Sequence, residues 1–121
     1  MIPEWMKEAP TPFDTVLVAN RGEIAVRIIK AVQEAGLTAV AIYSNPDKHS
    51  LHTEMADHAV YLPGDSLSEN YLNSEAIIQA AKSSGAQAIH PGYGFLSERA
   101  DFADAVDKSG IIWIGPSPEA I

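Results

Sequence analysis

The sequence has no cysteine, few basic residues and no long apolar run. Its 121 residues include 8 Lys and Arg against 16 Asp and Glu, which gives a formal net charge of -8. Without cysteine the chain cannot build a disulfide scaffold, an iron–sulfur site or a thiolate zinc site. The acidic balance argues against a nucleic-acid partner, because such a partner requires a basic face that neutralises phosphates.

Signals for membrane insertion and secretion are also missing. No apolar run approaches the roughly 18 residues that a helix needs to cross a bilayer. The first residues have neither the basic and apolar regions of a secretory signal nor the Arg- and Ser-rich character of a transit peptide. We therefore expect a cytoplasmic protein with no membrane partner.

Length and composition predict one folded domain with a short arm before it. A domain typically takes roughly 100–200 residues, and 46% hydrophobic with 20% charged residues is ordinary for a globular protein. Residues 1–12 contain three of the eight prolines and show no periodicity. We interpret 1–12 as an N-terminal arm and 13–121 as the domain.

Short apolar runs alternate with segments of helical periodicity from residue 15 onward. Residues 15–19 form a nearly continuous apolar run, as expected of a strand that is buried on both faces. Apolar residues then recur at helical spacing from Ile24 until Gly36, which suits a helix C-cap. The same cycle predicts strands at 15–19, 39–43, 59–62, 86–90 and 111–114, with helices at 24–35, 49–55, 74–84 and 97–109.

This alternation predicts an α/β fold. Right-handed βαβ units would form an open parallel sheet of about five strands with helices on both faces, Rossmann-like in the loose sense. Ligands bind such sheets outside the carboxyl ends of the strands. Three loops at that edge carry unusual residues, namely 20–23, 44–47 and 91–95.

The third loop matches only part of a dinucleotide-binding fingerprint. Gly92 and Gly94 stand at the first two glycine positions, but Ser97 replaces the third glycine, and no acidic residue ends the following strand. Both departures weaken a nicotinamide or flavin interpretation. Tyr93 between the two glycines either contacts a ligand or packs against the domain.

Several other polar residues allow a functional and a structural interpretation. Ser97 and Glu98 either contact a ligand or cap the predicted helix that starts there. Arg21 pairs either with a bound anion or with Glu23 or another surface acid. Arg27, Lys30 and Glu34 lie along one stripe of the first helix, which is either a solvated face or a contact for a partner subunit.

The histidines do not indicate a metal site or an acid–base catalyst. His49, His52 and His58 are close in sequence, but exposed or capping histidines are the favoured interpretation over metal ligands. His90 fits a hydrogen-bonded core histidine better than a catalytic one. The sequence also lacks a nucleophile elbow, a Walker loop and a lysine in a glycine-rich loop. We expect a domain that helps to form a site and holds no complete catalytic apparatus.

Three blocks of the sequence resemble one known family. The blocks are VLVANRGEIA at 16–25, AIHPGYGFLSE at 88–98 and IGP at 114–116. They look like the N-terminal domain of biotin carboxylase, the module found in acetyl-CoA, propionyl-CoA, methylcrotonyl-CoA, pyruvate and urea carboxylases. The resemblance covers about residues 13–121 and implies a pre-ATP-grasp fold. Other ATP-grasp ligases share this fold but not these motifs together.

The resemblance also implies an activity and a site. The family carboxylates biotin on a carrier protein, using ATP and bicarbonate with carboxyphosphate as intermediate. Its Gly-Tyr-Gly turn lies against the biotin pocket, so Tyr93 and Gly94 are expected to contact biotin, and Glu98 of the same motif joins the candidate substrate-binding residues. In bacterial members the helix after Asn-Arg-Gly-Glu contributes to a homodimer interface, which makes Arg27, Lys30 and Glu34 interface candidates.

The family's remaining machinery would begin after Ile121. The ATP-grasp domain that binds MgATP, the residues that hold bicarbonate, the C-terminal biotin carboxylase region, the biotinyl carrier and the carboxyltransferase are all expected as partners. No catalytic residue and no metal ligand is expected in this chain, which we predict to be inactive alone. The alternatives are a stand-alone Rossmann-like module that binds a nucleotide or metabolite, and an interaction domain that uses the Arg27 stripe.

Overall fold

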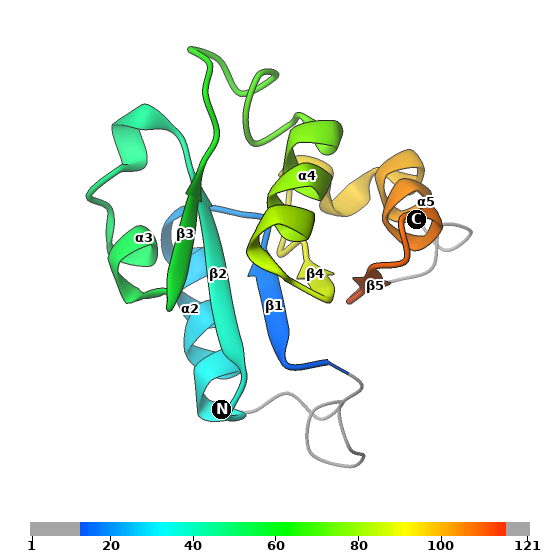
Figure 1. Cartoon of the computed structure of the whole chain (residues 1–121). Helices are drawn as coiled ribbons and strands as arrows, with labels where there is room; N and C mark the ends of the chain where they lie inside the picture. Colours follow the sequence, from blue (N-terminus) through cyan, green and yellow to red (C-terminus); the bar gives the residue numbers. More distant parts are fainter. Residues whose placement is uncertain (1–12, 116–121) are drawn as a thin grey trace.

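Five parallel strands form one sheet in the order β3-β2-β1-β4-β5 (Figure 1). In this computed structural model, which describes residues 13–115, the strands are β1 (Thr15–Val18), β2 (Thr38–Tyr43), β3 (His58–Tyr61), β4 (Ala88–His90) and β5 (Ile112–Trp113). The predicted open parallel sheet of about five strands is confirmed. The proposed arm, 1–12, and the last residues of the proposed domain, 116–121, lie outside the described residues.

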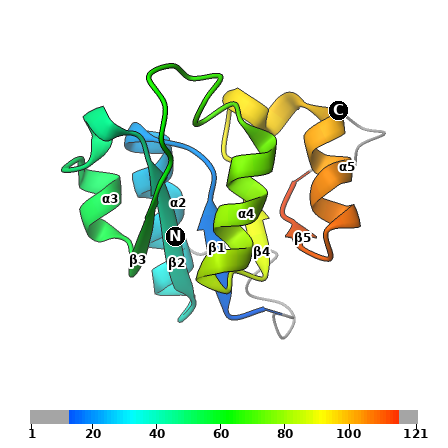
Figure 2. The ribbon, with the colours of Figure 1, turned by 45° about the horizontal axis from the view of Figure 1, so that its top comes forward.

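Helices cover both faces of the sheet, as predicted (Figures 1 and 2). Helices α2 (Gly22–Glu34) and α3 (Leu51–Met55) lie on one face, and α4 (Ser74–Ser84) and α5 (Ala100–Lys108) lie on the other. Alternation along the central strand explains the two layers. Val16 and Val18 of β1 pack with Ile29 of α2, whereas Leu17 faces the layer that contains Ile77 of α4.

The bounds of α4 follow from residues at its two ends. The Asn73 side chain accepts a hydrogen bond from the backbone N–H of Ala76 at 3.0 Å, so it satisfies one of the free donors of the first turn. Gly85 ends the helix with φ 77, a left-handed conformation that suits glycine. The predicted bounds, 74–84, are therefore confirmed, and of the two N-cap residues that the sequence allows, Asn73 and Ser74, Asn73 is the cap.

The last predicted helix is split, and its start was predicted wrongly. In place of a continuous helix over 97–109, a 3-10 turn η2 (Phe95–Glu98) precedes α5, and Arg99 between them is extended with φ -102 and ψ 106. Gly94 and Phe95 both have positive φ, 68 and 50, which begins the turn early and buries Leu96. Ser97 and Glu98 consequently do not cap α5, whose N-cap is Arg99.

Two further features complete the architecture. The 3-10 turn η1 (Asn45–Asp47) follows β2, and the segment 62–73 rises above the carboxyl ends of the strands at the top of Figure 1. Between residues 13 and 115, no helix has the length and apolar character that spanning a bilayer requires.

Candidate functional site

The parallel sheet brings the three predicted loops to one edge, and Asn20 connects the first of them to the third. The Asn20 side chain is 1% exposed, and its Nδ2 donates to the carbonyl oxygens of Pro91 at 2.9 Å and Tyr93 at 2.7 Å. Its Oδ1 accepts from the backbone N–H of Arg21 at 2.8 Å. This amide therefore ties the loop after β1 to the loop after β4.

Both glycines beside Tyr93 have a positive φ, 69 at Gly92 and 68 at Gly94, and Gly92 is required for a second reason, its close contacts. A Cβ at Gly92 would lie 2.7 Å from Asn20 Nδ2 and 3.0 Å from Ile24 Cγ2, so no larger residue fits there without displacing Asn20. Gly94 has open space around it, but its φ of 68 is in the region that favours glycine. The backbone thus turns sharply on both sides of Tyr93 and is also closely packed at Gly92.

Tyr93 projects from this turn beside a cleft. The side chain is 76% exposed, the highest value among the exposed large apolar residues of the structure between 13 and 115. The cleft has a volume of about 680 Å³, within the range of roughly 300–1,000 Å³ that is usual for small-molecule sites. Its lining residues are Phe13, His90, Pro91, Gly92, Tyr93, Ser97, Glu98, Ile112, Trp113, Ile114 and Gly115.

The cleft brings together two of the three predicted substrate-binding residues. Tyr93 and Glu98 both line it, whereas Gly94 shapes the turn and is not among its lining residues. The wall that the described residues form contains a phenol, a hydroxyl, a carboxylate and an indole, but neither Lys nor Arg. It can therefore hold a flat, polar but uncharged group, and it has no cation to bind nucleotide phosphates.

His90, at the end of β4, is a neutral hydrogen-bond acceptor that lines this cleft. Burial disfavours the imidazolium and lowers the pKa of His90 to about 4. Its Nδ1 accepts from the backbone N–H of Gly92 at 3.1 Å. This fits the predicted hydrogen-bonded histidine, and the imidazole gives the Tyr93 turn a second support.

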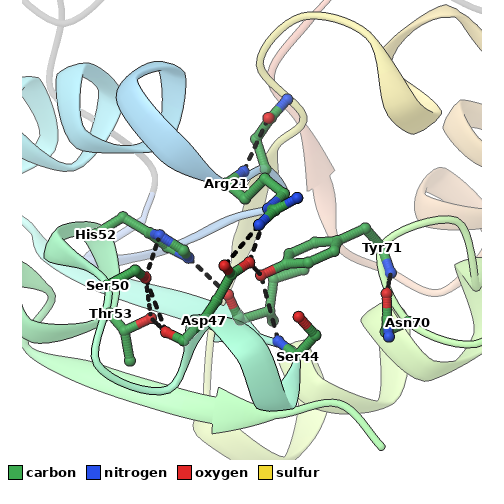
Figure 3. A network of polar contacts seen from close by, with 10 residues as sticks. Arg21, Ser44, Asp47, Ser50, His52, Thr53, Asn70 and Tyr71 are labelled. Atoms are coloured by element: carbon green, nitrogen blue, oxygen red, sulfur yellow. Dashed lines mark hydrogen bonds and ion pairs between the residues drawn. The ribbon is translucent and has the colours of Figure 1, made fainter. Parts of the chain in front are cut away.

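Arg21 pairs with Asp47, a partner that the sequence did not single out (Figure 3). Its Nε and Nη2 donate to the two carboxylate oxygens of Asp47 at 2.7 and 2.6 Å. The Tyr71 hydroxyl also donates to Asp47 Oδ2 at 2.6 Å and accepts from the backbone N–H of Ser44. Glu23, the acid considered for Arg21, pairs instead with Arg27 at 2.9 Å.

The hydrogen bonds among Arg21, Asp47 and Tyr71 stabilise the ionised form of Asp47 and the neutral form of Tyr71. Burial opposes ionisation of Asp47, but hydrogen bonds from Arg21 and Tyr71 outweigh it and hold the pKa of the carboxyl below its ordinary value. Burial, together with the hydrogen bond to Asp47, raises the pKa of Tyr71, so its phenol stays protonated and donates. A bidentate arginine with a buried carboxylate is a rigid connection between the loops after β1 and β2.

His52 corrects one expectation about the histidines. It is 1% exposed, not at the surface, and its ring bridges the Ile42 carbonyl at 3.1 Å and the Ser50 hydroxyl at 2.9 Å. Ser50 and Thr53 also donate to the backbone carbonyl of Asp47. Within residues 13–115, no group of three or more metal-ligating side chains comes together.

The three interface candidates lie away from the cleft. Arg27, Lys30 and Glu34 are exposed along α2, and none of them is among the lining residues. Arg27 makes an exposed ion pair with Glu23 one turn earlier. The structure thus places these residues on one accessible helix face, separate from the candidate ligand site.

Sequence reasoning missed Asn20, Asp47 and Tyr71 as site residues. Asn20 and Asp47 fall inside the loops that the pattern indicated, so their positions at the carboxyl edge were a usable signal. Tyr71 lies in a segment without periodicity and contacts Asp47 across 24 residues of sequence, a pairing that the sequence pattern does not indicate.

Comparisons with known proteins give one matching family model and several similar proteins. Residues 12–121 match the family model described as biotin carboxylase, N-terminal domain. The chain is 58% identical over 106 residues to the biotin-dependent acyl-coenzyme A carboxylase alpha3 subunit of Mycobacterium leprae, covering 88% of the chain and 18% of that protein. It thus spans less than a fifth of this relative's length.

Two solved structures extend the comparison. The Kluyveromyces lactis urea carboxylase is similar with a TM-score of 0.88 and 56% identity, covering 90% of this chain and 10% of that one. The biotin carboxylase domain dimer of the Hydrogenobacter thermophilus 2-oxoglutarate carboxylase, in complex with MgADP, ADP and bicarbonate, has a TM-score of 0.84 and 48% identity. It covers 89% of this chain and 24% of that one.

Proposed function

Because the chain belongs to the family of biotin carboxylase N-terminal domains, we propose that it forms one wall of the biotin pocket of such an enzyme. The observation that carries this proposal is Tyr93, an exposed phenol on a fixed turn beside a cleft of about 680 Å³. The phenol offers both a hydrogen-bonding group and a flat apolar surface to a ureido ring.

The proposed activity is ATP- and bicarbonate-dependent carboxylation of carrier-bound biotin. In this division of labour Tyr93 positions the ureido ring, Gly94 leaves room for the biotin side chain, and Glu98 lines the same cleft as Tyr93. No catalytic group is assigned to the chain. MgATP and bicarbonate would be held by the ATP-grasp and C-terminal regions, because the described cleft wall carries neither Lys nor Arg.

The further partners and the location follow from the family and stay predictions. We expect the complete enzyme to act on a biotin carboxyl carrier protein and to deliver the carboxyl group to a carboxyltransferase. A cytoplasmic location is expected for the whole. In this proposal the residues of this chain bind and orient biotin, and other domains bind the phosphates that react.

The site proposal is tested by replacing Tyr93 with Phe in the complete carboxylase. Loss of the hydroxyl is expected to raise the KM for free biotin at least fivefold, because one hydrogen bond to a ligand contributes roughly 1 kcal/mol. The KM for ATP should not change. Tyr61→Phe is the matched control, since Tyr61 is also exposed but lies on the edge strand β3. An unchanged biotin KM in Tyr93→Phe would remove Tyr93 from the site.

The division of labour has its own test. The 121-residue chain alone is expected to show no bicarbonate-dependent ATP hydrolysis with free biotin, whereas a chain that continues through the ATP-grasp region should show it. Turnover by the 121 residues alone would contradict the proposal.

We also propose that α2 supplies a homodimer interface through Arg27, Lys30 and Glu34. All three are exposed on one helix face. Lys30 cannot form the bidentate fork of the arginine that the family often has there, so this contact is expected to be weaker. Lys30→Glu should lower the dimer fraction in sedimentation equilibrium, while Lys82→Glu on α4 should not. Equal dimer fractions in both variants would count against this interface.

The stand-alone nucleotide-binding alternative is disfavoured by one observation. The neighbours of β1 in the sheet are β2 and β4, so the topological switch point, where Rossmann-like domains bind dinucleotides, lies between β1 and β4. There the buried Asn20 side chain bridges the two loops. Calorimetric titration of the chain with ATP, NAD and biotin separates the two functions, because micromolar binding of ATP or NAD would favour the alternative.

A further inference from the structure

Asn20 contacts the Tyr93 turn through a set of hydrogen bonds that only an amide side chain can make. Its Nδ2 donates to two carbonyls of the turn while its Oδ1 accepts from its own loop. Aspartate has the same shape but presents two acceptors to the carbonyls of Pro91 and Tyr93. A serine has one short hydroxyl and cannot bond both carbonyls at once.

The loop that carries Asn20 is itself fixed by hydrogen bonds of the next residue, Arg21. Asn20 is followed by Arg21, whose guanidinium is fixed by two hydrogen bonds to Asp47. Asp47 in turn bonds the buried Tyr71. A continuous series of hydrogen bonds thus runs from the Tyr93 carbonyl across the carboxyl ends of β4, β1 and β2.

We propose that Asn20 is a positioning residue that fixes the backbone of Tyr93 at the cleft. Asn20 itself does not line the cleft, so it acts through the turn. One consequence of this proposal, that biotin binding depends on Asn20, rests on the proposed function. The hold on the turn itself is a property of the chain and can be measured without any ligand.

Asn70 supplies a matched control within the same chain. It is 3% exposed, its Oδ1 accepts from the N–H of the next residue, Tyr71, at 2.8 Å, and its Nδ2 donates to the Gly64 carbonyl. The two asparagines thus share burial and local geometry. Only Asn20 contacts the Tyr93 turn, so Asn70→Asp removes an equivalent amide at a distance from it.

The first experiment measures amide hydrogen exchange in the full chain. Asn20→Asp is expected to speed exchange at Gly92 and Ser97, whose N–H groups bond within the turn, at least tenfold, with Ile77 and Ile78 of α4 unchanged. Asn70→Asp should instead loosen the segment around Gly64, whose carbonyl loses its donor, and leave the Tyr93 turn unchanged. Unchanged exchange at Gly92 and Ser97 in Asn20→Asp would overturn the proposal.

A second variant keeps the test valid if Asn20→Asp does not fold. Gly92→Ala keeps every donor and acceptor but places a Cβ 2.7 Å from Asn20 Nδ2. It should speed exchange at Ser97 as well, because it displaces the Asn20 amide from the opposite side at a position whose φ of 69 already disfavours alanine. If the turn in Gly92→Ala exchanges as slowly as in the unaltered chain, Asn20 is not what holds it.

The second experiment measures kinetics in the complete carboxylase. Asn20→Asp is expected to raise the KM for biotin at least tenfold with the KM for ATP unchanged, whereas Asn70→Asp should alter neither. Because Asn20 acts through Tyr93, adding Tyr93→Phe should raise the biotin KM by less than the product of the two single effects. Independent, multiplicative effects would overturn the positioning role. If the turn loosens in hydrogen exchange but the biotin KM stays unchanged, Asn20 holds the turn and the proposed function is wrong.

Discussion

Replacing Asp47 by Asn is expected to destabilise the fold by about 3 kcal/mol. The substitution keeps the volume of the side chain and leaves the backbone carbonyl that Ser50 and Thr53 contact. It removes the charge that accepts two hydrogen bonds from Arg21 and one from Tyr71. The new amide group must also point toward one of these donors.

The magnitude follows from how exposed each partner is. The Arg21 side chain is 42% exposed and can be hydrated when its partner is lost, so we assign to it the low end of the roughly 1.5–3 kcal/mol of a charged hydrogen bond. The Tyr71 side chain is 1% exposed. Where the new amide nitrogen faces its hydroxyl, the hydroxyl loses its acceptor, which costs about 1–3 kcal/mol.

The assay is urea unfolding of the full chain, followed by circular dichroism. The control is Glu23→Gln, which breaks an ion pair with Arg27 at 2.9 Å whose side chains are 77–78% exposed; it should cost less than about 0.5 kcal/mol. If Asp47→Asn destabilises no more than this control, the network does not stabilise the fold and the reasoning from burial is wrong.

Three further predictions concern pH, the phenol and a helix end. The pKa of His90 falls on folding from 6.5 to about 4, so the unfolded state binds the proton first, and the free energy of unfolding should drop by up to about 3 kcal/mol from pH 6.5 to 4. The pKa of His52 is also lowered on folding. His90→Asn, which keeps an acceptor for Gly92, should therefore reduce the pH dependence of the free energy of unfolding without abolishing it. An unchanged pH dependence would contradict the lowered pKa of His90. Tyr71→Phe should cost about 1–2 kcal/mol in urea unfolding, because Asp47 keeps both bonds from Arg21. A loss as large as that of Asp47→Asn would mean that the bonds from Arg21 contribute nothing to stability. Gly85→Ala meets no atom within 4 Å, so only its positive φ opposes the change, and a loss of about 1 kcal/mol is expected; a much larger loss would mean that space, not backbone conformation, requires glycine there.

The sheet and its layers could be predicted because their signals are local. The apolar run at 15–19 needs only burial on both faces to become β1, and Asn73 with Gly85 defines both ends of α4. The family was likewise predicted from contiguous motifs, and the match over 12–121 confirms it. Each of these features depends on residues that are close together in the chain.

The polar network could not be predicted because its partners are distant in sequence. Arg21 meets Asp47 across 26 residues, and Asn20 meets Tyr93 across 73. The start of α5 was missed for a different reason. Gly94 and Phe95 take positive φ values one after the other, and Phe95 has no intrinsic preference for that conformation, so only the tertiary fold determines it.

The fixed backbone of Tyr93 lowers the entropy cost of binding a ligand there. Ordering a free loop costs about 1–2 kcal/mol of conformational entropy for each residue. At Tyr93 that entropy is already lost when the domain folds, because Asn20 holds the carbonyls of Pro91 and Tyr93. A molecule that binds to the phenol restricts only the two side-chain torsions of Tyr93, an entropy loss on the order of 1 kcal/mol. Under the proposed function, carrier-bound biotin would therefore bind and dissociate at Tyr93 without any rearrangement of the domain.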